Sequence, residues 1–231
     1  MDNNQYYSGC TISSYQCHCF TKLSEEEKDI LETKSVNVRY KKGETILKQG
    51  SFASHIMYIV SGLAKIFIEG QGNLLVLKIV PSGNLVGLTS LNEGNNTFQY
   101  SAMAYVDTEI KQIDIQYFRQ LLAQNAAFAK EVINILNMNS IQINSRFFCL
   151  TYKQSYGRMA DILLCLAERI FKNHEFELPL NRKEIAELSG MSTETVVRLL
   201  KKFKEEKLIE TSNKYLKIID FDRLRMISQH G

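Results

Sequence analysis

The placement of glycine divides this sequence into a turn-rich part and a helical part. Eight of its twelve glycines lie between Gly43 and Gly94, and the next one is Gly157. They recur at intervals of roughly ten residues between short β-branched and aromatic runs, which is typical of turns in an all-β domain. We therefore expect a small antiparallel barrel or jelly roll over residues 36–115. Its strands are expected at Val36–Tyr40, Glu44–Leu47, Ile56–Val60, Leu63–Glu69, Leu74–Val80, Phe98–Tyr105 and Glu109–Ile115.

Composition indicates a globular protein and limits what it can bind. The 231 residues are 45% hydrophobic and 23% charged, enough for one large or two small domains. The net charge of +3 is too small for a polycation, so nucleic acid could be bound only by a local basic patch. No run approaches ~18 apolar residues, so we expect no membrane span. The first twenty residues lack an apolar secretory core, and we expect a cytoplasmic protein.

A long helical segment follows the predicted β domain, since residues 116–153 contain no glycine or proline. A helix is also expected before that domain, because Ser24 and Glu27 form a capping-box pattern. Within the long segment one apolar stripe has the steps of a coiled-coil seam: Ile133, Leu136, Ser140, Ile143, Phe147 and Leu150. A second stripe consists of Phe128, Val132, Ile135, Met138, Ile141 and Phe148. A surface helix needs only one stripe, so we expect one face on the β domain and one on a second subunit; a wholly internal helix is the alternative.

The last third of the chain has the start and stop signals of a helix-turn-helix. Asn181 and Glu184 form a capping-box pattern, and the short helix that follows ends at Gly190, which permits a left-handed turn. Ser192 then caps a second helix that runs to about Glu206. Two short helices joined through a glycine turn are typical of this motif. Around it we expect a helix over Ser155–Lys172, a strand over Phe176–Leu180 and a hairpin of Leu208–Glu210 and Tyr215–Ile219.

The two short helices have separate inward and outward faces. Ala186 is small where the helices cross, and Val196 is apolar where it faces the first helix; Ile185, Leu199 and Leu200 complete the inward face. The outward residues of the second helix are Thr193, Glu194, Val197, Arg198, Lys201 and Lys202. From Arg198 to Lys217, seven basic residues stand against three acidic ones, a local charge of +4. This pattern predicts DNA binding, with an ordinary helical hairpin and a solvated charged face as the alternative.

Four segments resemble the cyclic-AMP receptor protein/FNR family of bacterial transcription regulators. The family's winged helix-turn-helix resembles LNRKEIAELSGMSTETVVRLLKKFKEEKLIE, and its β-roll resembles KKGETILKQGS, YIVSGLAKIFIEGQG and VPSGNLVGLTSLNEGNN. The resemblance covers residues 20–225 and implies an α+β fold. Its parts would be a Cys-bearing leader (1–20), a β-roll sensory domain (21–115), a dimerisation helix (116–153) and a winged helix-turn-helix (154–231). It further implies a homodimer on an inverted-repeat operator in double-stranded DNA, with RNA polymerase as a further partner.

The resemblance also implies how the operator is recognised. Family members recognise their half-sites with a Glu and, four residues later, an Arg, which match Glu194 and Arg198 here. Arg198 would then bind a guanine and Glu194 a cytosine on the complementary strand. Val197 occupies an intervening position and would favour a thymine methyl or tolerate several bases. Phosphate contacts are expected from Lys201, Lys202 and the hairpin residue Lys214.

The positions expected to bind an effector lack both charged residues. Nucleotide-binding members of the family carry a Gly-Glu pair for the ribose and an Arg-Ser/Thr-Ala triplet for the cyclic phosphate. Here those positions are Gly87, Leu88 and then Tyr100, Ser101, Ala102. Sequestering a phosphate without a cation is costly, so we expect that cyclic AMP is not the ligand. An uncharged or lipophilic ligand and a filled, vestigial pocket are the alternatives.

The leader CTISSYQCHCF resembles the cysteine-rich leader of FNR, which holds a [4Fe-4S] cluster together with one β-roll cysteine. It contains Cys10, Cys17 and Cys19, and close thiolates suit iron–sulfur or zinc ligation. The spacing differs from the FNR pattern, and Lys111 stands where the fourth ligand would be. Five cysteines in all form no disulfide framework. We therefore expect reduced thiols, with a cluster, zinc and a redox disulfide as alternatives.

An enzyme and a ligand-binding regulatory module are the alternatives to a DNA-binding regulator. The sequence contains no GxSxG, GxxxxGK or HExxH motif, and its four histidines are scattered, so we expect no enzyme. A ligand-binding regulatory module that acts on a partner protein would fit the β-roll alone. The helix-turn-helix pattern disfavours it.

Overall fold

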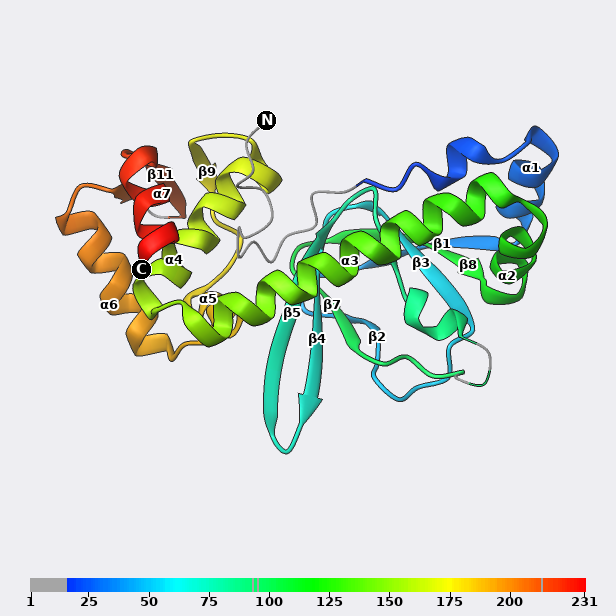
Figure 1. The fold of residues 1–231 in the computed structure, drawn as a ribbon, viewed down its shortest axis with the longest axis horizontal. Coiled ribbons are helices and arrows are strands. Elements are labelled where there is room, and N and C mark those ends of the chain that lie inside the picture. Colours follow the sequence, from blue (N-terminus) through cyan, green and yellow to red (C-terminus); the bar gives the residue numbers. More distant parts are fainter. Residues whose placement is uncertain (1–15, 93, 95, 213) are drawn as a thin grey trace. The chain divides into compact units, whose positions relative to one another are not determined.

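The computed structural model describes residues 16–231 except 93, 95 and 213, and these residues form two compact units (Figure 1). The first unit contains residues 16–73 and 79–140, and the second contains residues 74–78 and 141–231. In the described part of the chain, no helix is both long enough and apolar enough to cross a membrane.

The first unit begins with a short 3-10 helix, η1 (Cys19–Lys22), and helix α1 (Glu25–Thr33). The predicted capping box at the start of α1 is confirmed. The Ser24 hydroxyl accepts a hydrogen bond from the backbone N–H of Glu27 at 3.2 Å, and the Glu27 carboxylate accepts one from the N–H of Ser24 at 2.8 Å. Phe20 then packs edge-on against Tyr58, so the chain before α1 lies on the β domain.

Two four-stranded sheets make up the β domain. The first sheet has the order β1-β8-β3-β6, with β1 at Ser35–Tyr40, β3 at His55–Ser61, β6 at Leu85–Val86 and β8 at Thr108–Asp114. The second has the order β2-β7-β4-β5, with β2 at Thr45–Leu47, β4 at Leu63–Gly70, β5 at Asn73–Pro81 and β7 at Ser101–Ala104. The pairs β1–β8, β3–β8, β2–β7 and β4–β7 are antiparallel, which confirms the predicted β-roll. The short β6 was not predicted, and β7 is shorter than the predicted strand.

A single helix predicted over residues 116–153 is wrong, because two helices occupy this segment. They are α2 (Ile115–Gln124) and α3 (Ala126–Tyr152), separated by Asn125 in an extended conformation. The side-chain oxygen Oδ1 of Asn125 accepts from the N–H of Phe128 at 3.0 Å and so caps α3, while the side-chain Nδ2 donates to the Glu27 carboxylate at 3.0 Å. The side-chain partners of Asn125 therefore fix the start of the long helix ten residues later than expected.

The two apolar stripes of α3 differ in burial. At the N-terminal end of the second stripe, Phe128, Val132 and Ile135 are buried, and the Phe128 ring packs against Phe118 of α2. The exposed apolar residues of α3 are Ile133, Leu136, Met138, Ile141, Ile143, Phe147, Phe148 and Tyr152. In this chain one face of the helix is thus covered near its start, whereas the predicted seam is exposed from Ile133 to Phe147 and half-buried at Leu150.

The second unit contains the C-terminal helices and a small sheet. Its elements are α4 (Ser155–Cys165), a π-helical segment η3 (Leu166–Phe171), β9 (Glu175–Glu177), α5 (Arg182–Ser189), α6 (Thr193–Glu205), β10 (Ile209–Ser212), β11 (Tyr215–Ile218) and α7 (Phe221–His230). The sheet order is β10-β11-β9, and both pairings are antiparallel. The α-helix predicted over Ser155–Lys172 is wrong in its C-terminal part, because residues Leu166–Phe171 are π-helical. This segment ends at Lys172, which has a positive φ of 49°. Helix α7 was not predicted.

Candidate nucleic-acid interface

Helices α5 and α6 form the predicted helix-turn-helix. The capping box of α5 is present: the Asn181 side chain accepts from the N–H of Glu184 at 2.9 Å, and the Glu184 carboxylate accepts from the N–H of Asn181 at 2.7 Å. Gly190 ends α5 in the left-handed region, with φ 62° and ψ 42°, a conformation that other residues adopt only with strain. The Ser192 hydroxyl then accepts from the N–H of Thr195 at 3.2 Å and caps α6. Local hydrogen bonds therefore set where both helices begin and turn.

The inward face of the motif is buried as predicted. Val196 is fully buried and Ala186 is 4% exposed. The other buried residues of the two helices are Ile185, Leu188, Ser189, Leu199, Leu200 and Phe203. Because these side chains hold α5 and α6 together, the opposite face of α6 is left free for another molecule.

The outward face of α6 carries the residues predicted to meet DNA. Glu194, Val197 and Arg198 are exposed, and Thr193 is half-buried. The side chain of Arg198 makes no hydrogen bond or ion pair with any residue in the described part of the chain. A guanidinium that is both exposed and unpaired here keeps all its donors available for a base edge.

The charge of Glu194 is stabilised at the start of α6. Hydrogen bonding to its own backbone N–H and, to a lesser extent, to the Ser192 side chain lowers the pKa of Glu194. The positive end of the helix dipole favours a negative charge at the same place. Glu194 is therefore ionised near neutral pH and can accept a hydrogen bond from a donor such as the cytosine amino group.

The predicted phosphate-binding lysines make only weak ion pairs. Lys201 lies 3.7 Å from Glu205 and Lys214 lies 4.0 Å from Glu177, and all four side chains are exposed. Exposed pairs at this distance contribute little, so both lysines can exchange their partners for phosphates. Lys202 likewise lies 3.8 Å from Glu206, and its amine also lies over the Tyr156 ring, 4.5 Å from the centroid.

Sequence reasoning missed two residues that support the helix-turn-helix, one at α6 and one at α5. Tyr156 on α4 packs edge-on against Phe203 and donates from its hydroxyl to the Glu206 carboxylate at 2.5 Å. Burial and this carboxylate raise the pKa of Tyr156 to about 12. Arg146 on α3 is buried and donates to the carbonyl oxygen of Leu188 at 2.5 Å, near the end of α5. The available signal for Arg146 was a lone charged residue in a stretch, residues 132–152, that contains no other Asp, Glu, Lys or Arg.

The predicted effector positions lie in the first unit, around a short 3-10 helix, η2 (Leu88–Leu91). The backbone N–H of Gly87 donates to the hydroxyl oxygen of Tyr100 at 2.7 Å, and Leu88 is buried. The Tyr100 ring is partly exposed, whereas burial of its hydroxyl raises the pKa of Tyr100. Ser101 is fully buried and accepts from the N–H of Gln49 at 3.0 Å. Gly87 and Tyr100 are thus hydrogen-bonded to each other, whereas the Ser101 hydroxyl is hydrogen-bonded to the backbone of Gln49 and not to either of them.

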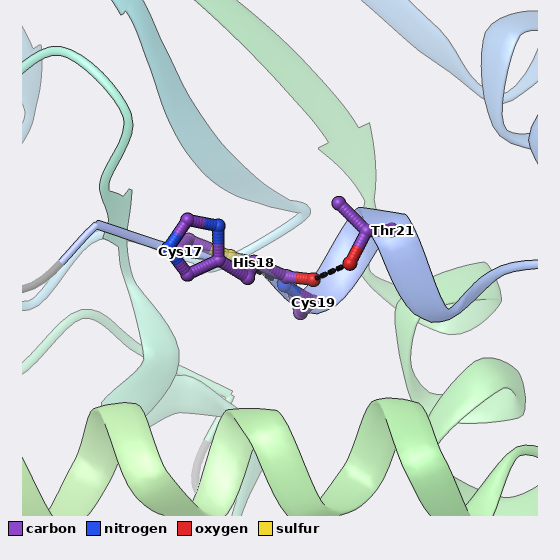
Figure 2. The surroundings of a disulfide bond; sticks show 4 residues. All are labelled: Cys17, His18, Cys19 and Thr21. Carbon is purple, nitrogen blue, oxygen red and sulfur yellow. Dashed lines mark hydrogen bonds between the residues drawn. A yellow bond between two sulfur atoms is a disulfide. The ribbon is translucent and has the colours of Figure 1, made fainter.

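The cysteines of the leader are arranged differently from the expected thiols. Cys17 and Cys19 form a disulfide, with their Cα atoms 5.5 Å apart (Figure 2). Cys19 is fully buried and the N–H of Cys17 donates to the carbonyl oxygen of Gly83 at 2.7 Å. Cys10 lies outside the described residues.

This arrangement does not fit the [4Fe-4S] ligand set. The sulfurs of Cys17 and Cys19 are bonded to each other, and Lys111 pairs with Glu32 at 2.5 Å. Among the residues that the structure describes, no group of three His, Cys, Asp or Glu side chains could hold a metal ion. The free thiol in this part of the chain is that of Cys149, which is buried in α3.

Comparison with solved structures supports the fold. A regulator assigned to the Crp/Fnr family from Eubacterium rectale superposes with a TM-score of 0.75 at 18% identity, covering 92% of this chain and 98% of that chain. A CooA mutant from Carboxydothermus hydrogenoformans superposes with a TM-score of 0.74 at 22% identity, covering 94% and 97%. Both likenesses extend over nearly the whole chain, from the β domain through the helix-turn-helix.

Curated relatives cover the chain to a similar extent. Electron transport regulator A of Shewanella oneidensis is 26% identical, covering 96% of this chain and 92% of that protein. The fumarate and nitrate reduction regulatory protein of Escherichia coli K12 is also 26% identical, covering 96% and 89%. These relatives are regulators, in agreement with the expectation that the chain is not an enzyme.

Family models match both predicted domains in the order seen in the fold. The model of the cyclic nucleotide-binding domain matches residues 37–125, and that of the Crp-like helix-turn-helix domain matches residues 157–227. Together they span more than half of the sequence. With the full-length relatives and the shared fold, they show that the chain belongs to the CRP/FNR family of transcription regulators.

Proposed function

We propose that this chain acts as a homodimer that recognises an inverted-repeat operator through helix α6. The observation that carries the proposal is the outward face of α6, where the exposed Glu194 and Arg198 lie beside an exposed Val197. Their spacing of four residues places Glu194 and Arg198 one above the other on that face. Arginine donates bidentately to guanine and glutamate accepts from cytosine, so this face can read base pairs in the major groove.

The docking follows the geometry of helix-turn-helix proteins. The recognition helix lies in the major groove and its N-terminal residues meet the base edges, which here brings Glu194 in first. Lys201 and Lys202, further along α6, and Lys214 on the hairpin then meet phosphates and fix the register. Val197 offers only apolar contact and therefore favours a thymine methyl or accepts several bases.

The exposed seam of α3 supports a homodimer. Ile133 is 56% exposed, Ile143 43% and Phe147 71%, and all three lie on the stripe with coiled-coil steps. A contiguous apolar stripe of this kind is unusual on a monomer. A second copy of the same helix would cover it symmetrically, and two-fold symmetry in the protein demands a two-fold operator. RNA polymerase is the proposed partner of the operator-bound dimer.

The effector is proposed to be something other than cyclic AMP. Leu88 and Tyr100 supply no charge at the two positions where the family's nucleotide-binding members carry Glu and Arg. The hydroxyl of Tyr100 already satisfies the N–H of Gly87. An uncharged or lipophilic molecule is the ligand class that these positions could accept without a large desolvation cost.

Selection of bound DNA from a random pool tests the proposal. We expect the enriched sequences to share an inverted repeat with half-sites about one helical turn apart, and gel shifts to show a single complex of two chains per duplex. Enrichment of unrelated sequences would exclude specific recognition. Enrichment of a lone half-site, bound by one chain, would exclude the dimer while retaining the base-reading role of α6.

A further inference from the structure

A buried ion pair lies where helix α3 ends and helix α4 begins. The Lys153 amine is 2.7 Å from one Asp161 carboxylate oxygen and 2.9 Å from the other. The two side chains are only 10% and 5% exposed. Lys153 directly follows the last residue of α3, and Asp161 faces it from the middle of α4. The pair therefore bridges the connection between the long helix and the helix-turn-helix within the second unit.

The C-terminal helix α7 joins the same pair. The Lys153 amine donates to the carbonyl oxygen of Ser228 at 2.6 Å, and the Ser228 hydroxyl donates to Asp161. Ser228 lies in the last turn of α7, where carbonyl oxygens lack helical partners and a cation is favourable. Lys153, Asp161 and Ser228 form a network, and each of the three residues bonds both of the others.

A thiol completes the surroundings of the carboxylate. The Cys149 thiol donates to Asp161 at 3.4 Å from one turn before the end of α3. Burial, with the nearby Asp161 charge, raises the pKa of Cys149 to about 11, so the thiol stays protonated and remains a donor. Asp161 accordingly accepts from donors on α3, on α7 and at Lys153, as a buried carboxylate requires.

A second contact between α4 and α7 is made by backbone alone. A Cβ atom on Gly157 would lie 2.5 Å from the carbonyl oxygen of Gly231, so only glycine leaves room for this approach. Gly157 is in the first turn of α4, four residues before Asp161. The network and the glycine contact therefore hold the same two helices at two neighbouring points.

The network is connected to the recognition helix through α4. Tyr156 lies one residue before Gly157, packs against Phe203 of α6 with ring centroids 4.8 Å apart, and bonds Glu206 at the end of α6. Any rotation of α4 about the end of α3 would therefore carry α6 with it. A buried ion pair is a weak source of stability, but it can specify one geometry because any other leaves a charge unpaired.

We propose that Lys153, Asp161 and Ser228 are positioning residues that set the direction in which the helix-turn-helix leaves helix α3, and thereby the half-site spacing that the protein accepts. This inference rests on the proposed homodimer. In a two-fold dimer joined along α3, the direction of departure decides the distance and rotation between the two copies of α6. None of the three residues touches the outward face of α6, so base preference within a half-site is independent of them.

Gel shifts on a spacing series test the inference. The duplexes carry the selected inverted repeat at its best spacing and with one base pair added or removed. We expect wild-type protein to prefer the best spacing. We expect Lys153→Met/Asp161→Leu, which replaces the buried pair by apolar groups, to reduce that preference by between about 2-fold and about 30-fold. Ser228→Ala should reduce it in the same direction but less.

Two comparisons separate positioning from simple destabilisation. Arg225→Ala breaks an exposed ion pair between α7 and Glu168, 2.8 Å long, and should leave the spacing preference unchanged. All variants should keep the wild-type preference for bases within a half-site. Equal loss of affinity at every spacing, or an unchanged preference in both network variants, would overturn the inference. Wild-type protein that binds all spacings alike would overturn the proposed dimeric recognition as well. The behaviour of the wild type therefore distinguishes failure of the proposed function from failure of the positioning inference.

Discussion

The backbone N–H of Gly87 donates a hydrogen bond to the hydroxyl oxygen of Tyr100 at 2.7 Å. Gly87 has φ 97° at the start of η2, and a Cβ there would lie 3.2 Å from the Phe98 ring. The Thr89 side chain bonds the same hydroxyl. The chain therefore uses its own phenol to satisfy a donor at the positions where an effector was expected, and this arrangement disfavours an anionic ligand.

Cyclic AMP should accordingly not raise the affinity of this protein for its operator. Neither Leu88 nor Tyr100 supplies a charge that would offset the cost of burying a phosphate, and the hydroxyl of Tyr100 already accepts the hydrogen bond of the Gly87 N–H. Titration calorimetry with cyclic AMP at micromolar concentration is expected to give no binding heat. A clear binding isotherm, or tighter gel shifts with the nucleotide present, would contradict this prediction.

The hydrogen bond between Gly87 and Tyr100 should contribute measurably to the free energy of unfolding. Tyr100→Phe removes the hydroxyl and leaves the Gly87 N–H without its partner, which costs about 1–3 kcal/mol when the donor is buried. Chemical unfolding followed by circular dichroism measures the loss. Tyr58→Phe is the matched control, because the hydroxyl of Tyr58 bonds no residue in the described part of the chain. Equal stability of the two variants would show that water replaces the phenol.

A charge in the seam of α3 should separate the two subunits. Ile143→Glu places a carboxylate on a surface that the proposed dimer buries twice, and losing one buried side chain of this size costs about 1.5–3 kcal/mol. Sedimentation should show a dimer dissociation constant at least tenfold higher than that of the wild type, with operator binding lost in parallel. Asn137→Glu, exposed on the same helix but outside the seam, should leave both unchanged. A monomeric Ile143→Glu protein with normal operator affinity would exclude the arrangement.

The elements that the sequence predicted are those whose boundaries depend on neighbouring residues. Asn181 with Glu184, Gly190 and Ser192 act over three or four positions, so the helix-turn-helix and its inward face follow from local chemistry. The glycine-marked strands follow for the same reason. The outward direction of Arg198 could also be predicted, because the 3.6-residue period fixes it once the inward Val196 is known.

The features that the sequence did not predict depend on partners far along the chain. The break between α2 and α3 requires Asn125 to bond Glu27, 98 residues away. Helix α7 has Leu224 as its single buried apolar residue in the described chain, so its apolar pattern was weak, and its docking depends on Ser228 reaching Asp161 across 67 residues. The bond from Gly87 to Tyr100 crosses between elements in the same way. No local pattern reveals such pairs.

Gly157→Ala should destabilise the protein although alanine is the better helix former. Alanine gains up to about 1 kcal/mol in a helix interior, but the added methyl would meet the backbone of Gly231, and overpacking typically costs about 1–3 kcal/mol. Thermal unfolding should show a lower midpoint. Removing residues 230–231 eliminates the clash, so in that shortened chain the same substitution should raise the midpoint. If alanine lowers the midpoint equally in both chains, the contact with α7 is not the cause.

Protein purified without oxygen should contain no iron–sulfur cluster. Two of the three proposed leader ligands, Cys17 and Cys19, are bonded to each other, and Lys111 at the fourth position pairs with Glu32. The expected sample is colourless, with sub-stoichiometric iron by elemental analysis. A brown protein that bleaches in air, and that loses its colour in Cys17→Ser, would show that the leader rearranges to hold a cluster.

Substitutions on the outward face of α6 should have two different effects: loss of base preference in Arg198→Ala and loss of nonspecific electrostatic affinity in Lys201→Ala. Arg198→Ala removes a bidentate donor, so the selected consensus should lose its preference at one symmetric pair of guanines, a discrimination of about 1–3 kcal/mol at each. Lys201→Ala should weaken all sequences alike and reduce the salt dependence of binding by about one ion per subunit. Both side chains are exposed, so neither substitution disturbs the core of the motif. Selection experiments and salt titrations on the same three proteins measure the two effects. If the consensus of Arg198→Ala equals that of the wild type, α6 does not dock as proposed; a sequence-dependent loss in Lys201→Ala would instead place that lysine at a base edge.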